Sequence, residues 1–146
     1  MSFIYGRTST QHRDTCAPPL IEVMNLGLEM SPVDISIVRG WSGEEVQNML
    51  FRTEASQKQW PFSEHNFMLD NNPHSKAFDF APHLGKEIRI PWKDTHLFAV
   101  IAGVFFAAAS RIGVKLRWGG DWNMNGLTTD QTFMDWGHIE IEEYEV

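Results

Sequence analysis

Asp135 and His138 are the first pair of residues whose types and spacing could carry chemistry. The Asp lies three residues before the His, and an alternating apolar and polar run, Ile139–Glu142, follows. Such alternation predicts a half-buried strand, with His138 at its start and Asp135 on the turn before it. An imidazole and a carboxylate held in this way could serve as a metal ligand and a general base. A hydrogen-bonded pair that closes a turn is the plainer interpretation.

A second acidic residue, Asp79, lies in the otherwise apolar run Ala77–Pro82. This run predicts a short buried strand that carries a carboxylate on its inner face or at its rim. A charge in such a place needs a partner or a metal ion, because burying an unpaired charge is unfavourable.

The elements that must position these residues follow from hydrophobic periodicity and from Pro and Gly. The longest expected helix is apolar nearly all round, so it should lie in the centre of the fold. The expected order is a polar arm (1–15), a helix from Pro18 to Ser31, a strand (34–38), a helix (43–51), a long surface loop (53–76), a strand (77–82), the central helix (91–112), a strand (114–118), a polar loop (124–133) and a final strand from His138.

Length and composition limit the class of protein. A chain of 146 residues with 42% hydrophobic and 21% charged residues predicts a single globular domain over residues 1–146. A net charge of -7 without a basic block gives no indication of nucleic acid or an anionic membrane as a partner. One cysteine, Cys16, excludes an intrachain disulfide and cysteine-rich zinc sites. We expect no signal peptide and no membrane span, because the longest apolar run, 97–109, is short.

Three short fragments, taken in their order along the chain, are similar to motifs of a known family. They are Ala77-Phe78-Asp79, then Arg117-Trp118-Gly119-Gly120-Asp121-Trp122, then Asp135-Trp136-Gly137-His138. This order resembles the VanY-like D-Ala-D-Ala carboxypeptidase group of zinc peptidases, in particular the phage endolysins that cut the L-alanyl-D-glutamate bond of peptidoglycan. The resemblance covers nearly the whole chain. It implies a small α+β fold, an antiparallel sheet with helices packed around it.

The resemblance also implies a site. In the family, a His, an Asp and a second His hold zinc, and an acid before the second His acts as the base. By position, Asp79 and His138 are then ligands and Asp135 is the base. Three ligands leave a fourth position open for water.

Two positions depart from the family's pattern. The first His ligand is expected seven residues before Asp79, where this chain has Asn72, and an Arg that positions the substrate is expected where it has Ser42. An amide is a poor zinc donor beside imidazole. A loop could bend His74 inward in its place, and His65 and His83 are also near in sequence.

These departures lead to two expectations. The first is a phage peptidase-like domain that has lost its zinc site, binds no cofactor and serves as a virion structural or cell-wall-binding protein. Its partners would be other virion proteins or peptidoglycan, and it would be made in the host cytoplasm and join the virion. The alternative is an active zinc L-alanyl-D-glutamate endopeptidase in which His74 or Asn72 completes the site. In both, the expected substrate-binding residues are Ser42, Trp118, Trp122 and Trp136.

Overall fold

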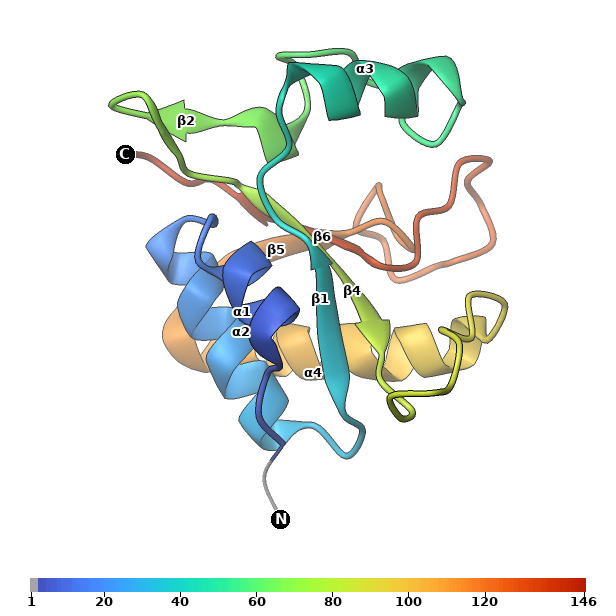
Figure 1. Ribbon diagram of the computed structural model, residues 1–146. Coiled ribbons are helices and arrows are strands. Elements are labelled where there is room, and N and C mark those ends of the chain that lie inside the picture. The colour runs from blue at the N-terminus through green and yellow to red at the C-terminus, as the bar shows by residue number, and fades with distance from the viewer. Residues whose placement is uncertain (1–2) are drawn as a thin grey trace.

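The computed structural model describes residues 3–146 and confirms a small α+β fold (Figure 1). Its elements, in chain order, are α1 (Arg7–Arg13), α2 (Pro18–Met30), β1 (Ile35–Arg39), α3 (Glu44–Arg52), the 3-10 turn η1 (Glu64–Asn66), β2 (Met68–Leu69), β3 (Asn72–Pro73), β4 (Ala77–Pro82), α4 (Thr95–Ile112), β5 (Lys115–Trp118) and β6 (His138–Glu142).

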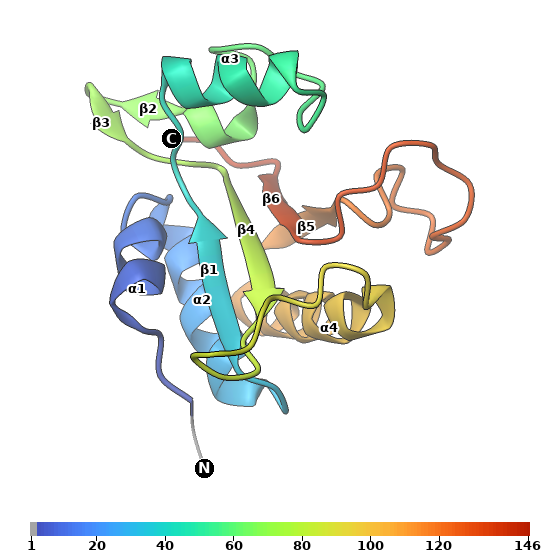
Figure 2. The ribbon, with the colours of Figure 1, turned by 45° about the vertical axis from the view of Figure 1, so that its right-hand side comes forward.

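The central sheet has four strands in the order β1-β4-β6-β5, and each neighbouring pair is antiparallel. The strands β2 and β3 form a separate hairpin that projects beside α3 (Figure 2). The first and last thirds of the chain therefore meet at β4, which pairs with β1 on one side and with β6 on the other.

The two faces of the sheet have different roles. On one face, Phe78 and Phe80 of β4 are fully buried and contact Phe105 of α4 edge to face. Helices α2 and α4 cover this face, and they approach so closely that a Cβ at Gly27 would lie 2.5 Å from the Phe105 ring. Since successive side chains of a strand point to opposite faces, Asp79 is directed to the other face, where the candidate site lies.

Helix α4 has well-defined ends. Asp94 caps its first turn by accepting a hydrogen bond from the Leu97 N–H, and Gly113 ends it with a left-handed backbone at φ 88°. The expected start was Pro91, but the helix begins at Thr95, because the Asp94 side chain caps the first turn. Its length and apolar composition would also suit a membrane span, but core helices share these properties, and the buried side chains of α4 pack against α2 and the sheet.

Two segments are more ordered than their sequences suggested. The expected arm 1–15 contains the helix α1. Its polar sequence has no apolar period that would predict a helix. A contact with the sheet stabilises it, because Ser9 Oγ accepts a hydrogen bond from the Ile37 N–H of β1. The expected loop 53–76 contains η1 and the β2–β3 hairpin. Asp70 and Asn71 both have positive φ, 51° and 63°, as a two-residue hairpin turn requires.

Candidate metal centre

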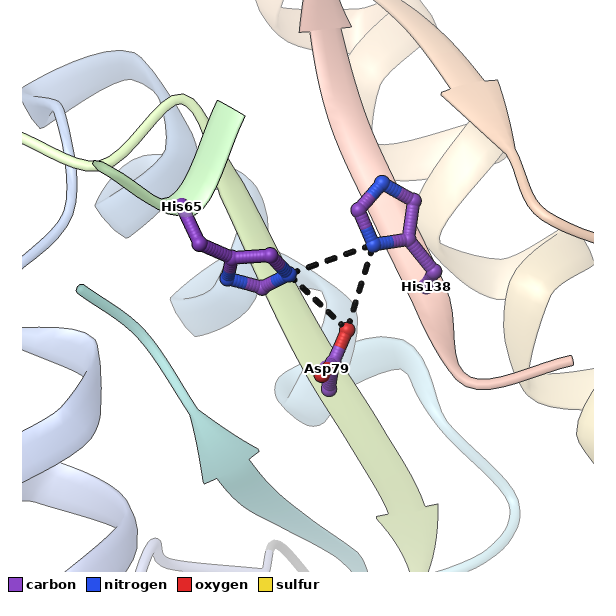
Figure 3. Close-up of side chains that lie close together, drawn as sticks. All are labelled: His65, Asp79 and His138. Carbon is purple, nitrogen blue, oxygen red and sulfur yellow. Dashed lines mark hydrogen bonds and ion pairs between the residues drawn. The ribbon is translucent and has the colours of Figure 1, made fainter. Parts of the chain in front are cut away.

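Three potential metal ligands meet on the open face of the sheet (Figure 3). They are His65 Nε2 from η1, Asp79 Oδ1 from β4 and His138 Nδ1 from β6. Each of the three pairs of atoms is 3.2 Å apart. Both imidazoles are buried, and the Asp79 side chain is 18% exposed. The cluster therefore joins three separate parts of the chain at the floor of a cleft.

The sheet fixes two of these ligands. Asp79 and His138 are directly opposite each other in the antiparallel pair of β4 and β6. The third ligand sits on a capped turn, in which the Ser63 hydroxyl accepts from the His65 N–H and the Asn66 side chain accepts from the Ser63 N–H. All three ligands are thus positioned by local hydrogen bonding that does not involve the metal.

In each histidine, the ring nitrogen that points away from the cluster determines whether the nitrogen that points into the cluster carries a proton or a lone pair. His65 Nδ1 lies 2.7 Å from the Gly40 carbonyl oxygen, and His138 Nε2 lies 2.8 Å from Glu140 Oε1. Because a carbonyl and a carboxylate can only accept, each of these nitrogens donates. A neutral imidazole has one donor, so the inner nitrogens present lone pairs to each other and to Asp79. Three acceptors in contact repel one another unless a positive charge lies among them.

Zinc fits this arrangement. Tetrahedral zinc bonds imidazole nitrogen and carboxylate oxygen at roughly 2.0–2.2 Å, which places neighbouring ligand atoms about 3.3 Å apart. The 3.2 Å separations match this geometry. Two His and one Asp also form a donor set of the kind found in three-ligand zinc sites.

The pKa values show that the cluster attracts positive charge. Burial alone would lower the pKa of His138, but hydrogen bonds to Asp79 and Glu140 raise it to about 9. Burial would raise the pKa of Asp79, but the charges and hydrogen bonds of His65 and His138 hold it well below its usual range. Burial lowers the pKa of His65. The cluster therefore stabilises a positive charge beside Asp79.

Asp135 lies beside the cluster on the segment that enters β6, and it lines the cleft. Burial, together with the charge of Asp79, raises the pKa of Asp135 to about 6. Its backbone is fixed on both sides, since its N–H donates to the Gly119 carbonyl and its carbonyl accepts from the His138 N–H. A Cβ at Gly119 would lie 2.1 Å from the Asp135 carbonyl oxygen, so this close approach requires glycine. A carboxylate with a pKa near neutrality suits a general base.

A cation from the end of β1 completes the polar floor. The register of β1 against β4 shifts between Ile37, which pairs with Phe80 in the core, and Arg39, which pairs with Asp79. Simple alternation would place Ile37 and Arg39 on the same face; the irregularity redirects Arg39 into the cleft. Its guanidinium donates to Ser42 Oγ at 2.7 Å and to Gln47 Oε1 at 2.9 Å, and it lies 3.5 Å from Asp79 Oδ2.

The cleft above the cluster has a volume of about 480 Å³. One wall is the 55–64 segment with Lys58, and the other is the 130–135 segment with Phe133. The Trp122 indole lies against the cluster, 5.2 Å from the His138 ring. The volume is sufficient for a short peptide segment, and the floor combines a metal-binding cluster, an acid and a cation.

The structure does not bring every predicted residue to this cleft. Asn72 is exposed in the β2–β3 hairpin, and His74 follows it, bonded to the Tyr144 hydroxyl at 2.7 Å; neither is part of the cluster. Ser42 is buried and accepts a hydrogen bond from Arg39 Nε. Trp118 and Trp136 pack against each other and the core, so Trp122 is the predicted tryptophan that lines the cleft.

The spacing rule missed His65. Counting back seven residues from Asp79 leads to Asn72, but the β2–β3 hairpin lies between Ser63-Glu64-His65 and Ala77-Phe78-Asp79. His65 therefore lies further from Asp79 along the chain than the expected spacing of the first His ligand. The turn residues Asp70 and Asn71 were the signal of an inserted hairpin.

Comparisons with known proteins identify the family of the chain. Residues 1–142 match the family model described as phage L-alanyl-D-glutamate peptidase. The chain is 32% identical to the L-alanyl-D-glutamate peptidase of Escherichia phage T5, over 97% of this chain and 99% of that protein. Its fold is similar to the crystal structure of the Serratia marcescens L-Ala D-Glu endopeptidase ChiX, with a TM-score of 0.72 and 23% identity over 95% of this chain and 90% of that one. The chain belongs to the phage L-alanyl-D-glutamate peptidase family.

Proposed function

We propose that this protein is an active zinc endopeptidase that cleaves the L-alanyl-D-glutamate bond of bacterial peptidoglycan. The observation that carries the proposal is the 3.2 Å triangle of His65 Nε2, Asp79 Oδ1 and His138 Nδ1. The relatives named as L-alanyl-D-glutamate peptidases support the choice of bond. Together these findings favour the active enzyme over the expected non-catalytic virion or cell-wall-binding protein, since that expectation rested on a missing third ligand.

Each residue on the cleft floor has a task in this proposal. His65, Asp79 and His138 would hold zinc, which supplies Lewis acidity toward a peptide carbonyl and an attacking water. Asp135 accepts the proton of the water and returns a proton to the leaving amine, because its pKa of about 6 allows both states. Arg39 places a fixed positive charge where negative charge develops on the substrate.

The residues that line the cleft support this choice of substrate. In peptidoglycan the D-glutamyl residue is linked through its side-chain carboxyl, so a free carboxylate lies next to the scissile bond. Arg39 and Lys58, both of which line the cleft, offer positive charge to such a group. Trp122 presents an aromatic surface against which the apolar part of the stem peptide, or a neighbouring sugar, can pack.

The test combines metal analysis with product analysis. Purified protein is expected to retain one zinc per chain after dialysis. Incubation with purified peptidoglycan should produce new amino-terminal glutamate, which dinitrophenyl labelling and amino-acid analysis detect. An Asp135→Asn variant should keep the zinc and release glutamate termini about 10²- to 10⁴-fold more slowly. Stoichiometric zinc without new glutamate termini, or no zinc at all, would refute the proposal and support a binding role.

A further inference from the structure

We propose that Glu140, held in place by Arg117, is a positioning residue that selects the metal-binding nitrogen of His138. The inference rests on the proposed zinc site and extends it, because it concerns what gives one ligand its orientation and donor strength. It predicts that a residue that does not touch the metal determines how tightly the metal is held.

Both oxygens of the Glu140 carboxylate have a specific partner. Oε1 lies 2.8 Å from His138 Nε2, and Oε2 lies 2.8 Å from an Nη of Arg117. Glu140 is 4% exposed, so this carboxylate is nearly removed from water. Hydrogen bonds of a buried carboxylate to charged or polar donors are strong and directional. The Glu140 carboxylate is therefore held in place through both of its oxygens.

The strand register explains why these three residues meet. His138 and Glu140 are two apart on β6, so their side chains leave the same face of the sheet. Arg117 of β5 is directly opposite Glu140, just as Asp79 of β4 is directly opposite His138. The cleft face of the sheet thus carries a continuous row, from Asp79 through His138 and Glu140 to Arg117.

The contact with Glu140 decides which nitrogen faces the metal. A neutral imidazole carries one N–H, and the Glu140 carboxylate takes it at Nε2, which leaves the Nδ1 lone pair directed at Asp79 and His65. An anionic acceptor on the far side of the ring also makes the ligating nitrogen a better electron donor. A ring without this acceptor is free to adopt the other tautomer or to rotate.

Trp122 encloses the same group from the cleft side. Its ring centroid lies 5.2 Å from that of His138, and the Arg117 guanidinium carbon lies 5.5 Å from the indole centroid. The arginine is therefore in contact with both the carboxylate that orients His138 and the aromatic ring that covers it. This arrangement limits the access of water to the hydrogen bond between Glu140 and His138.

The chain offers a matched control in Glu142. It is on the same strand and the same side as Glu140, and it also pairs with Arg117, at 3.1 Å from Nε. It contacts Arg117 rather than His138, and its side chain is 28% exposed. Removing Glu142 takes away the same charge and the same side-chain length but leaves the hydrogen bond to His138 intact.

The experiment measures zinc affinity by competition with a chromophoric chelator for the wild type and for Glu140→Ala, Glu140→Gln and Glu142→Ala. We expect roughly 10- to 100-fold weaker zinc binding in Glu140→Ala, as for other residues that support metal-bound histidines. Glu140→Gln keeps an oxygen acceptor, so it should lie between the wild type and Glu140→Ala, and Glu142→Ala should bind as the wild type does. Circular dichroism monitors folding, and if Glu140→Ala does not fold, weaker binding in Glu140→Gln decides the question.

Two results would overturn the inference while leaving the proposed function intact. One is wild-type zinc affinity in Glu140→Ala or, where that variant does not fold, in Glu140→Gln. The other is an equal loss in Glu142→Ala, because that would point to a general effect of charge near Arg117. A wild-type protein that takes up no zinc, or that takes it up and cuts no peptidoglycan, would instead count against the proposed function.

Discussion

Asp79 lies directly opposite His138 in the antiparallel pair of β4 and β6, so a carboxylate and an imidazole leave the same face of the sheet with Oδ1 and Nδ1 3.2 Å apart. Cross-strand partners are held at a fixed spacing by the hydrogen-bonded ladder. This part of the metal centre is therefore rigid. His65, which comes from a short capped turn, is the ligand that completes it.

The first prediction concerns the identity of the third ligand. His65→Ala should reduce zinc affinity by more than the roughly 100-fold upper range seen for residues that only support a ligand. Asn72→Ala, which removes the residue at the family's usual spacing, should leave zinc affinity unchanged, because Asn72 is exposed in the hairpin. Equilibrium dialysis followed by metal analysis checks both. Loss of zinc in Asn72→Ala alone would mean that the hairpin rearranges when the metal binds.

The second prediction concerns Asp135. Asp135→Asn keeps the size of the side chain but removes the base, so turnover should fall by about 10²- to 10⁴-fold while zinc stays bound. Burial and the charge of Asp79 raise the pKa of this carboxyl to about 6 in the metal-free protein, and a bound metal ion lowers it. The wild-type rate should therefore rise with pH, with a midpoint below about 6. Peptidoglycan turbidity assays over a pH series measure both effects, and a flat profile below pH 6 in the presence of zinc would argue for a different base.

The same carboxyl gives a stability prediction for the metal-free protein. Its pKa is about 6 when folded and about 3.9 when unfolded, so the folded state binds the proton more tightly. Its contribution to stability is complete below about pH 4 and is lost as pH rises through about 6. Asp135→Asn should remove this part of the pH dependence. Urea unfolding midpoints of chelator-treated protein across this range provide the comparison.

The sequence predicted those parts of the site that depend on a short stretch of chain, and it missed those that depend on contacts between distant segments. The apolar run 77–82 and the alternation in 139–142 were enough to place Asp79 and His138 on strands, and the structure pairs these strands. His65 was missed because a spacing rule assumes an unbroken segment, and an inserted hairpin separates it from Asp79. Arg39 was missed because its direction depends on a register shift between β1 and β4, which arises from strand pairing and not from the sequence of β1 alone.

A further prediction follows from the pKa of His138. Burial alone would lower this pKa, but the hydrogen bonds to Asp79 and Glu140 raise it to about 9, so at neutral pH zinc must displace a proton from the ring. Zinc binding should then release up to about one proton, and zinc affinity should increase with pH until about 9. Calorimetric titrations in buffers with different ionisation enthalpies count the protons. Binding without proton release would indicate that His138 is already neutral.

Two glycines provide a test of the packing beneath the site. A Cβ at Gly27 of α2 would lie 2.5 Å from the Phe105 ring, whereas a Cβ at Gly103 of α4 has no atom within 4 Å. Gly27→Ala should therefore destabilise the protein by roughly 1–3 kcal/mol through overpacking. Gly103→Ala should stabilise it by up to about 1 kcal/mol, because alanine favours a helix interior. Thermal unfolding of both variants is the measurement. A loss of stability in Gly27→Ala alone would indicate close contact between the helices, whereas a loss in both variants would indicate that any substitution in α2 or α4 destabilises the protein.

The last prediction concerns Arg39, which under the proposed function would take the role of the arginine expected at position 42. Its guanidinium is held by Ser42 and Gln47 and reaches the cleft beside Asp79, so it is preorganised to meet negative charge on the substrate. Arg39→Met should lower kcat/KM by about 10²- to 10³-fold, the range found when one preorganised donor is removed from a reaction centre. Zinc content should not change, since Arg39 is not a ligand. Arg89→Met, an exposed arginine on the loop after β4, is the matched control and should be as active as the wild type. Equal activity of Arg39→Met and Arg89→Met would mean that the cation needed for the reaction comes from Lys58 or another residue of the cleft wall.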